Sequence, residues 1–269
     1  MPALIGLDVG FSATKATSAV AVVLNDGCRV GRATSACESR YRLLKDVGIS
    51  EVIAIDAPLL PTAAGRVRVC EQVFASGMFQ RRCKAGFSHV PGTGQALRAA
   101  GHAAAEQFGK VAAVTESANF PRVVRSSNVV EAFPNAFLGV CLSEDTYGRM
   151  PRLRRGRKFD WLYDQWCIEG RFAELVGVLS DHLPATFAAQ CENEDDHEHR
   201  AALICVATAA CVAANRYCAV GDEHGGYFFL PPWTLWSEWS RGGLGAASRR
   251  FAGLQVWRDG KVDDVKTPK

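Results

Sequence analysis

The sequence predicts a mixed α/β fold, in which a sheet of antiparallel and parallel strands is flanked by helices. Three apolar runs open the chain, and Asn25-Asp26-Gly27 between the second and third is a strong hairpin signal. A segment with helical periodicity follows, and then a fourth apolar run. The chain therefore begins β-β-β-α-β, an antiparallel meander followed by a crossover back to the sheet. These five elements are expected at residues 3–9, 16–24, 28–35, 38–47 and 51–56.

Later elements extend this domain to about residue 232. The segment at 191–217 has the clearest helical pattern, because its acidic start suits the positive end of a helix dipole and its body is apolar nearly all round. Trp233, Trp236 and Trp239 recur at a spacing that would form one stripe on a helix. We predict a domain over 1–232 and a Trp-rich C-terminal extension over 233–269 that packs on it. Further helices are expected at 95–108 and 157–180, strands at 111–115 and 128–133, and a hairpin at 218–230.

The bulk composition is that of an ordinary globular chain. It has 269 residues, 48% of them hydrophobic, and a net charge of only +3, which does not by itself indicate a nucleic-acid binder. The ten cysteines are scattered without a CxxC pair, so we expect free thiols in a reducing compartment. No apolar run reaches 18 residues and no export signal is visible. We therefore expect a cytoplasmic protein with no membrane partner.

Three acids stand at the ends of apolar runs, each next to a small residue. They are Asp8, Asp56 and Glu131. In a mixed sheet of this order the first and fourth strands can be neighbours, so Asp8 and Asp56 would lie side by side and Glu131 would extend the row. A buried carboxylate is costly unless something compensates it, and a divalent cation is the simplest shared compensator. The alternative is that these acids form turns or cap helices.

A fourth acid is expected from the start of the helix at 191–217. Asp195 and Glu198 would share one helix face at i, i+3, and either could complete a metal site. His197 beside them could serve as an acid or base. A solvated acidic helix cap is the alternative explanation of this turn.

Carboxylates around two metal ions about 4 Å apart are the arrangement that hydrolyses phosphodiesters. Mg²⁺ suits such a site, because it binds few carboxylates together with substrate phosphates. Four arginines that follow Asp56 are candidate phosphate contacts: Arg66, Arg68, Arg81 and Arg82.

Several of these segments resemble the DUF429 family, a group of proteins with a predicted RNase H-like fold. The resemblance covers about residues 3–232. It is carried by Ile5-Gly6-Leu7-Asp8-Val9-Gly10, Ile55-Asp56-Ala57-Pro58-Leu59, Val69-Cys70-Glu71, Val130-Glu131-Ala132-Phe133-Pro134, His197-Glu198-His199-Arg200-Ala201-Ala202-Leu203-Ile204-Cys205, Gly221-Asp222 and Phe229-Leu230-Pro231-Pro232.

The resemblance implies an RNase H-like mixed sheet and, by analogy with the nucleases of that superfamily, a site for Mg²⁺ or Mn²⁺. Asp8, Asp56 and one of Glu198 or Asp195 would then be metal ligands, and Glu131 is carried over from its family segment. One position departs from the pattern. Resolvase-like relatives often carry Asp at the start of the last helix, where this chain has Ala201.

The leading functional hypothesis is a metal-dependent nuclease acting on DNA or RNA, with Asp8, Asp56, Glu131, Glu198 and His197 as catalytic residues. The first alternative is a nucleotide-binding phosphotransferase or ATPase-like protein, which would normally repeat the domain in a longer chain. The second is a catalytically inactive scaffold. Assembly into a homo-oligomer is left open by the sequence.

Overall fold

The computed structural model describes residues 3–25, 27–59, 67–83, 86–108, 128–154 and 156–263. The predicted strand at 111–115 and Arg66 lie outside these residues. The elements are β1 (Ala3–Asp8), β2 (Ser18–Leu24), β3 (Gly27–Ala33), α1 (Cys37–Leu43), β4 (Ser50–Asp56), α2 (Val69–Phe74), α3 (Gly77–Arg82), α4 (Thr93–Phe108), β5 (Val129–Glu131), α5 (Pro134–Gly139), α6 (Glu144–Gly148), α7 (Lys158–Ile168), α8 (Arg171–Val178), α9 (Phe187–Asn193), α10 (His197–Ala213), β6 (Cys218–Asp222), β7 (Gly226–Leu230), the 3₁₀ turn η1 (Trp233–Leu235), α11 (Glu238–Arg250), β8 (Gln255–Arg258) and β9 (Lys261–Val262).

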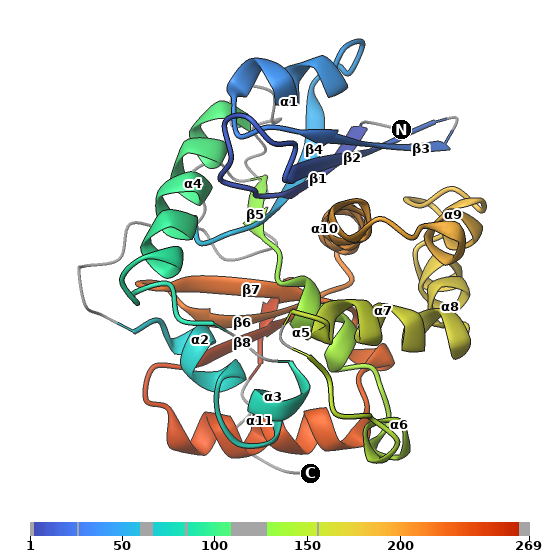
Figure 1. Ribbon diagram of the computed structural model, residues 1–269. Helices are drawn as coiled ribbons and strands as arrows, with labels where there is room; N and C mark the ends of the chain where they lie inside the picture. The colour runs from blue at the N-terminus through green and yellow to red at the C-terminus, as the bar shows by residue number, and fades with distance from the viewer. Residues whose placement is uncertain are drawn as a thin grey trace.

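A five-stranded mixed sheet has the order β3-β2-β1-β4-β5 (Figure 1). The first three strands form an antiparallel meander, and β1, β4 and β5 run parallel. The predicted meander and the adjacency of the first and fourth strands are therefore confirmed. β1 and β4 are apolar along almost their whole length because helices cover both faces of the sheet, as is usual for parallel strands.

The two faces of this sheet bury different helices. Side chains of α4, together with partly buried ones from α1, pack on the face that carries Ile5, Leu7 and Ile55, whereas α10 covers the opposite face (Figure 1). Residues Ala201 to Val212 of α10 are all buried, as its uniformly apolar sequence predicts.

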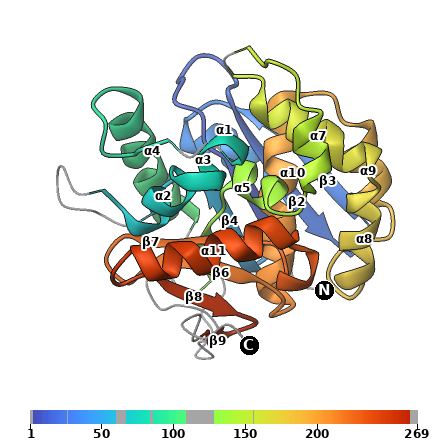
Figure 2. The same ribbon diagram turned by 90° about the horizontal axis from the view of Figure 1, so that it is seen from below.

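A second sheet, with the order β7-β6-β8-β9, joins the C-terminal segment to the rest of the protein. β6 and β7 form the predicted hairpin, and β8 pairs with the other edge of β6. A bridge between Ala132 and Phe229 connects the end of β5 to β7. Figure 2 shows α11 beside α3. The segment 233–263 therefore supplies both a covering helix and sheet strands.

Two predicted helices are each divided in the structure. The helix expected at 157–180 is α7 followed by α8, with Gly170 between them at a positive φ of 66°. The helix expected at 191–217 is the end of α9, a break, and α10, which begins only at His197. Asp196 caps α10, because its side chain accepts a hydrogen bond from the His199 amide.

The three tryptophans do not form one helical stripe. Trp233 lies in η1, Trp236 is extended, and Trp239 lies in α11. Trp236 and Trp239 are buried, and their indole groups donate to the carbonyls of Pro231 and Leu142. They anchor the start of the C-terminal segment to the rest of the protein.

All ten cysteines are free thiols, as their scattered spacing predicts, and most are buried. Of the helices in the described parts of the chain, none combines the length and apolar character that a membrane span needs.

Candidate active site

Asp8 and Asp56 end neighbouring parallel strands at the same level of the sheet. β1 pairs with β4 so that Asp8 lies opposite Asp56 in the ladder. Residues in register on adjacent strands project from the same face, so the two carboxylates lie side by side. The preceding Leu7 and Ile55 are buried on the α1 and α4 face, and strand alternation therefore directs both acids toward α10. The predicted adjacency of the two acids is confirmed, whatever their chemical role.

Neither carboxylate of this acid pair is directly bonded to a donor or a cation among the described residues. Among the described residues, no group donates a hydrogen bond to the side chain of Asp8 or Asp56, and neither forms an ion pair. Burial raises the pKa of Asp56 to about 7. Burial also raises the pKa of Asp8 well above its usual range, and repulsion from Asp56 and Glu198 adds to this effect. A bound cation would relieve this repulsion and favour ionisation of both groups.

Close packing of α10 on β1 brings Glu198 to the acid pair. A Cβ on Gly6 would lie 2.4 Å from the Ala202 carbonyl oxygen and 2.2 Å from the Val206 amide nitrogen, so only glycine allows this approach. Asp8 lies about 7 Å further along β1. Glu198 lies one helical turn, about 6 Å, before Ala202. The contact at Gly6 therefore places the start of α10 over the end of β1, and Asp8, His197 and Glu198 line one surface hollow.

Arg32 of β3 holds two acids at the start of α10. Its Nη2 lies 2.5 Å from Glu198 Oε2 and 2.5 Å from Asp196 Oδ2. Glu198 is thus near Asp8 but already paired. Asp195 is exposed and precedes the helix, so the predicted i, i+3 pairing of Asp195 with Glu198 on one helix face is wrong. The reason is the break after α9, which makes Asp196 the helix cap.

His197 is oriented by a carboxylate from another helix. Its Nδ1 lies 2.7 Å from Oδ1 of Asp160 in α7, and Asp160 also pairs with Arg157 at 3.1 Å. The ring of Phe159 packs edge-on against the imidazole. The side chain of His197 is 50% exposed, and Nδ1 is the ring nitrogen that Asp160 engages. A histidine held in this way can exchange protons with a bound substrate or water.

Glu131 does not extend the row formed by Asp8 and Asp56. It is in register with Ile55, and strand alternation places its side chain on the opposite face from the acid pair. Its two oxygens accept from Nη1 and Nη2 of Arg68 at 2.8 and 2.5 Å. Burial raises the pKa of Glu131 to about 7 even though Arg68 opposes that shift. Glu131 and Asp56 nevertheless line a common cavity on the other side of Asp56 from Asp8.

The predicted phosphate-binding arginines do not converge on the acid pair. Arg68 is 1% exposed, and besides Glu131 it contacts Glu71 and the Gly225 carbonyl. Arg81 is exposed at the end of α3. Arg82 pairs with Glu144 at 3.0 Å, and its guanidinium lies 4.2 Å from the centre of the Trp239 ring. Arg82 is therefore engaged with the C-terminal segment.

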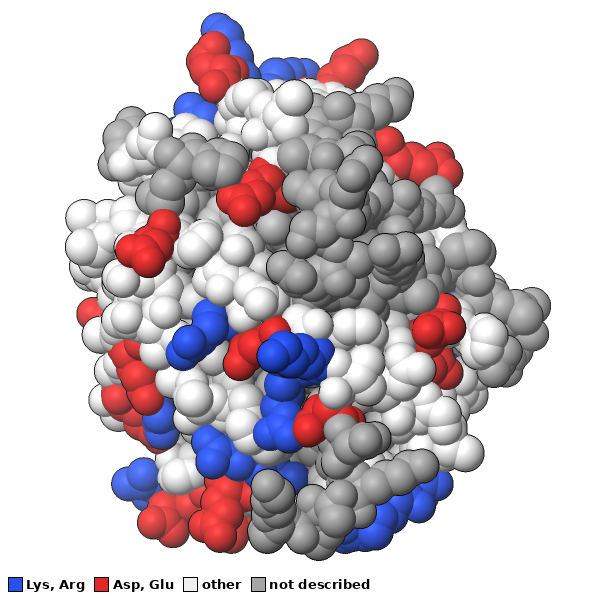
Figure 3. Space-filling view, turned by 180° about the vertical axis from the view of Figure 1, so that it is seen from behind, with Lys and Arg blue, Asp and Glu red and all other residues white. Residues whose placement is uncertain are grey.

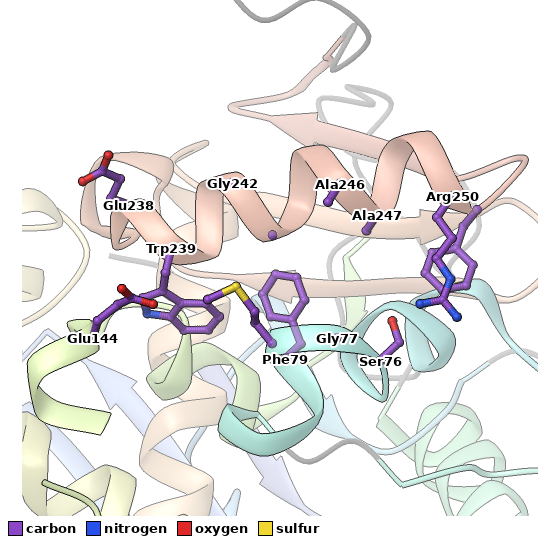
Figure 4. Close-up of a pocket in the computed structure, with 13 residues that line it drawn as sticks. Ser76, Gly77, Phe79, Glu144, Glu238, Trp239, Gly242, Ala246, Ala247 and Arg250 are labelled. Atoms are coloured by element: carbon purple, nitrogen blue, oxygen red, sulfur yellow. The ribbon is translucent and has the colours of Figure 1, made fainter. Parts of the chain in front are cut away.

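A hollow of about 590 Å³ lies between α3 and α11, separate from the acids discussed above. Figure 4 shows Phe79 and Trp239 side by side in it, with Glu144 and Glu238 near one end and Arg250 at the other. Small residues such as Gly242 leave its α11 wall open. None of the acids predicted as ligands or catalysts lines this groove.

Surface charge gives little direct indication of a nucleic-acid interface. On the face opposite that of Figure 1, basic and acidic side chains are interleaved and do not form a stripe of one sign (Figure 3). This agrees with the small net charge of the chain. Any phosphate binding would depend on a few placed groups or on bound cations, since a broad basic surface is not seen on that face.

Two residues that support Asp8 were not singled out from the sequence. Ser18 Oγ donates to the Asp8 carbonyl at 2.8 Å and accepts from the Gly10 amide at 3.0 Å. Arg40, which is 2% exposed, donates to Ser18 Oγ at 3.1 Å and has the charge to lower the pKa of Asp8. Arg40 lies on a short amphipathic helix, where a charged residue is normally expected at the surface, so the sequence carried no signal for its burial.

Within the described residues, no three or more His, Cys, Asp or Glu side chains are grouped as metal ligands. The acid pair on its own still fits a Mg²⁺ ion that completes its shell with water and substrate oxygens, since Mg²⁺ is usually held by one or two carboxylates. In comparisons with protein-family models, curated proteins and solved structures, none matched this chain.

Proposed function

We propose that this protein is a metal-dependent phosphodiesterase acting on nucleic acid, with an RNase H-like fold and with Asp8 and Asp56 holding Mg²⁺ or Mn²⁺. The observation that carries the proposal is the placement of these two carboxylates in register, side by side, with no compensating donor among the described residues. Two adjacent acids with raised pKa values are costly to ionise together unless a cation binds.

The strand order supports the fold part of the proposal. An antiparallel meander, followed by a helix and a parallel fourth strand beside the first, is what the resemblance to the DUF429 family implies. The start of α10 near Asp8 also agrees with an acid on a C-terminal helix, although Glu198 takes this place and Ala201 stands where related nucleases often have Asp.

The chain's own residues would contribute as follows. Asp8 and Asp56 would bind the cation, which when bound activates water and stabilises charge on a phosphate. Asp160 accepts the Nδ1–H hydrogen bond of His197 and leaves Nε2 free to accept a proton from water or to return one to the leaving oxygen. Arg32 would hold Glu198 beside Asp8 and offset its negative charge, so the cation would depend mainly on Asp8 and Asp56.

Cleavage of single-stranded, double-stranded and branched DNA and RNA with millimolar Mg²⁺ or Mn²⁺ tests the proposal. We expect cleavage that EDTA abolishes and that Asp8→Asn lowers by at least about 10²-fold, because a ligand of the activating cation is lost. Asp181→Asn is the matched control, since Asp181 is an exposed acid on a different segment.

The alternatives give distinct outcomes. ATP turnover without cleavage would support a nucleotide-dependent phosphotransferase. No cleavage of any substrate, together with no metal binding by the native chain, would support an inactive scaffold. The engagement of Glu198 by Arg32 is the observation that keeps the scaffold under consideration.

A further inference from the structure

A cavity of about 410 Å³ lies on the side of Asp56 away from Asp8. Its walls come from the end of β4 and the loop after it, from α2, from the segment 86–91 and the start of α4, and from β5 and β7. Asp56 is partly exposed in it, whereas Glu71, also in its lining, is only 2% exposed. The cavity therefore connects Asp56 to a buried polar network. Its volume is in the range of sites that bind small organic ligands.

The buried network leaves acceptors in excess of donors. Arg68 uses Nε for the Gly225 carbonyl and both Nη atoms for Glu131, and Nη1 also reaches Glu71 at 3.3 Å. Glu71 Oε1 accepts in addition from the Ser88 amide at 3.2 Å. Its Oε2 is buried and has no donor among the described residues. A ligand that satisfied this oxygen would need to bring N–H groups.

The remaining walls are apolar and aromatic. Phe133 and Phe228 lie with ring centres 4.6 Å apart, and Phe87, 38% exposed, forms part of the opening. Leu97 and Pro91 add aliphatic surface. Such walls favour a flat ring that stacks or packs against aromatic side chains.

We propose that this cavity binds an unpaired nucleobase with adjacent N–H donors on one edge, with guanine the best match. The guanine edge presents a ring N–H next to an amino group, and both can donate to the one Glu71 oxygen that has no donor, Oε2, whereas uracil places one N–H between two carbonyl oxygens that would face the acid. The choice of a nucleobase over another aromatic donor rests on the proposed function, because the cavity begins at Asp56, one of the two acids that would hold the cation.

Binding of free nucleosides in EDTA tests the cavity without requiring catalysis. We expect ligand-observed NMR to detect guanosine, inosine to bind more weakly because it lacks the amino group, and uridine to bind at least about tenfold more weakly than guanosine. Phe87→Ala should weaken guanosine binding by about tenfold through loss of ring contact. Thr93→Trp, a substitution at an exposed lining position, should block it.

Ile168→Ala is the control, because Ile168 is an exposed apolar residue on α7 and lines none of the hollows described above. The affinity for a single-stranded oligonucleotide that contains guanosine is compared with the affinity for free guanosine. This comparison distinguishes a site for nucleic acid from a site for the free nucleoside. Equal binding of guanosine and uridine would overturn the proposal. So would guanosine binding that neither Phe87→Ala nor Thr93→Trp changes.

The failure of this inference can be separated from failure of the proposed function. Metal-dependent cleavage with no base preference and no nucleoside binding would remove the base site and leave the nuclease. Guanosine binding that Thr93→Trp blocks, in a protein that cleaves nothing, would remove the nuclease and leave the site.

Discussion

His197 Nδ1 and Asp160 Oδ1 lie 2.7 Å apart although 37 residues separate them in the chain. The contact joins the first residue of α10 to the first turn of α7 and fixes the imidazole at the edge of the hollow that contains Asp8. Asp160 is therefore a positioning residue for His197, the predicted acid or base. Neither of the two sequence segments indicates this contact on its own.

The first prediction concerns this pair. Asp160→Asn should lower kcat by about tenfold or more and shift the pH dependence of kcat, because the imidazole loses the carboxylate that fixes its tautomer. His197→Gln should cost more, about 10²-fold. Arg157→Gln removes the other partner of Asp160 and leaves the His197 contact, so it should change kcat little. Equal losses in Asp160→Asn and Arg157→Gln would contradict a positioning role.

The second prediction concerns pH. The pKa of Asp56 is about 7 in the folded protein but about 4 in an unfolded chain. Between these values the folded state holds more protons, so the free energy of unfolding contributed by Asp56 falls as pH rises from about 4 to 7. In EDTA, Asp56→Asn should therefore raise the free energy of unfolding at pH 8 by about 1–2 kcal/mol, allowing for solvent screening. The gain should vanish near pH 4. Urea titrations at both pH values measure it, and a pH-independent gain would argue against a raised pKa.

The third prediction concerns cation binding. At pH 8, Mg²⁺ or Mn²⁺ at about ten times its Kd should stabilise the native chain by about 1.4 kcal/mol. This corresponds to a rise in Tm of roughly 3–5 °C for a domain of this size. Asp8→Asn and Asp56→Asn should each abolish the rise, and Asp181→Asn should retain it. Differential scanning calorimetry with Mg²⁺, with Mn²⁺ and with Na⁺ at matched ionic strength distinguishes a site from general screening. A rise that survives both acid substitutions would place the cation elsewhere.

The fourth prediction concerns the contact between β1 and α10. Gly6→Ala should lower the free energy of unfolding by about 3 kcal/mol, because its Cβ would overlap the α10 backbone. Any folded fraction should also lose activity, since α10 would shift and carry Glu198 with it. Gly242→Ala is the matched control: it lies within α11 with no atom near the added Cβ. It should stabilise the protein by about 0.5–1 kcal/mol. Chemical denaturation of both variants gives the comparison.

The parts of the fold that were predictable are those with a strong local pattern. β1 and β4 are continuous apolar runs, so their burial and the acids at their ends could be inferred, and the meander with its single crossover made β1 and β4 neighbours. The boundaries of the helices were harder to predict from the sequence. The break between α9 and α10 is set by Asp196 as a cap, in a run of polar residues that fits a continuous helix equally well.

The electrostatic arrangement was the hardest to predict. Arg68 follows Asp56 closely in sequence and looked like an exposed phosphate ligand, but the approach of β7 buries it against Glu131 and Glu71. The partners of Arg68 are far from it in the sequence: Glu131 lies 63 residues later and Gly225 lies 157 residues later. A charged side chain is normally expected at the surface, so the sequence alone does not predict that Arg68 is buried. Its burial follows only from the way the two sheets pack together.

β8 protects the open edge of the β6–β7 hairpin. A fragment ending at residue 232 would present an unpaired row of β6 amide and carbonyl groups to solvent, and such rows recruit strands from other molecules. By occupying this edge, β8 leaves no such row on β6, and we expect a chain shortened at residue 232 to aggregate even with both acids in place.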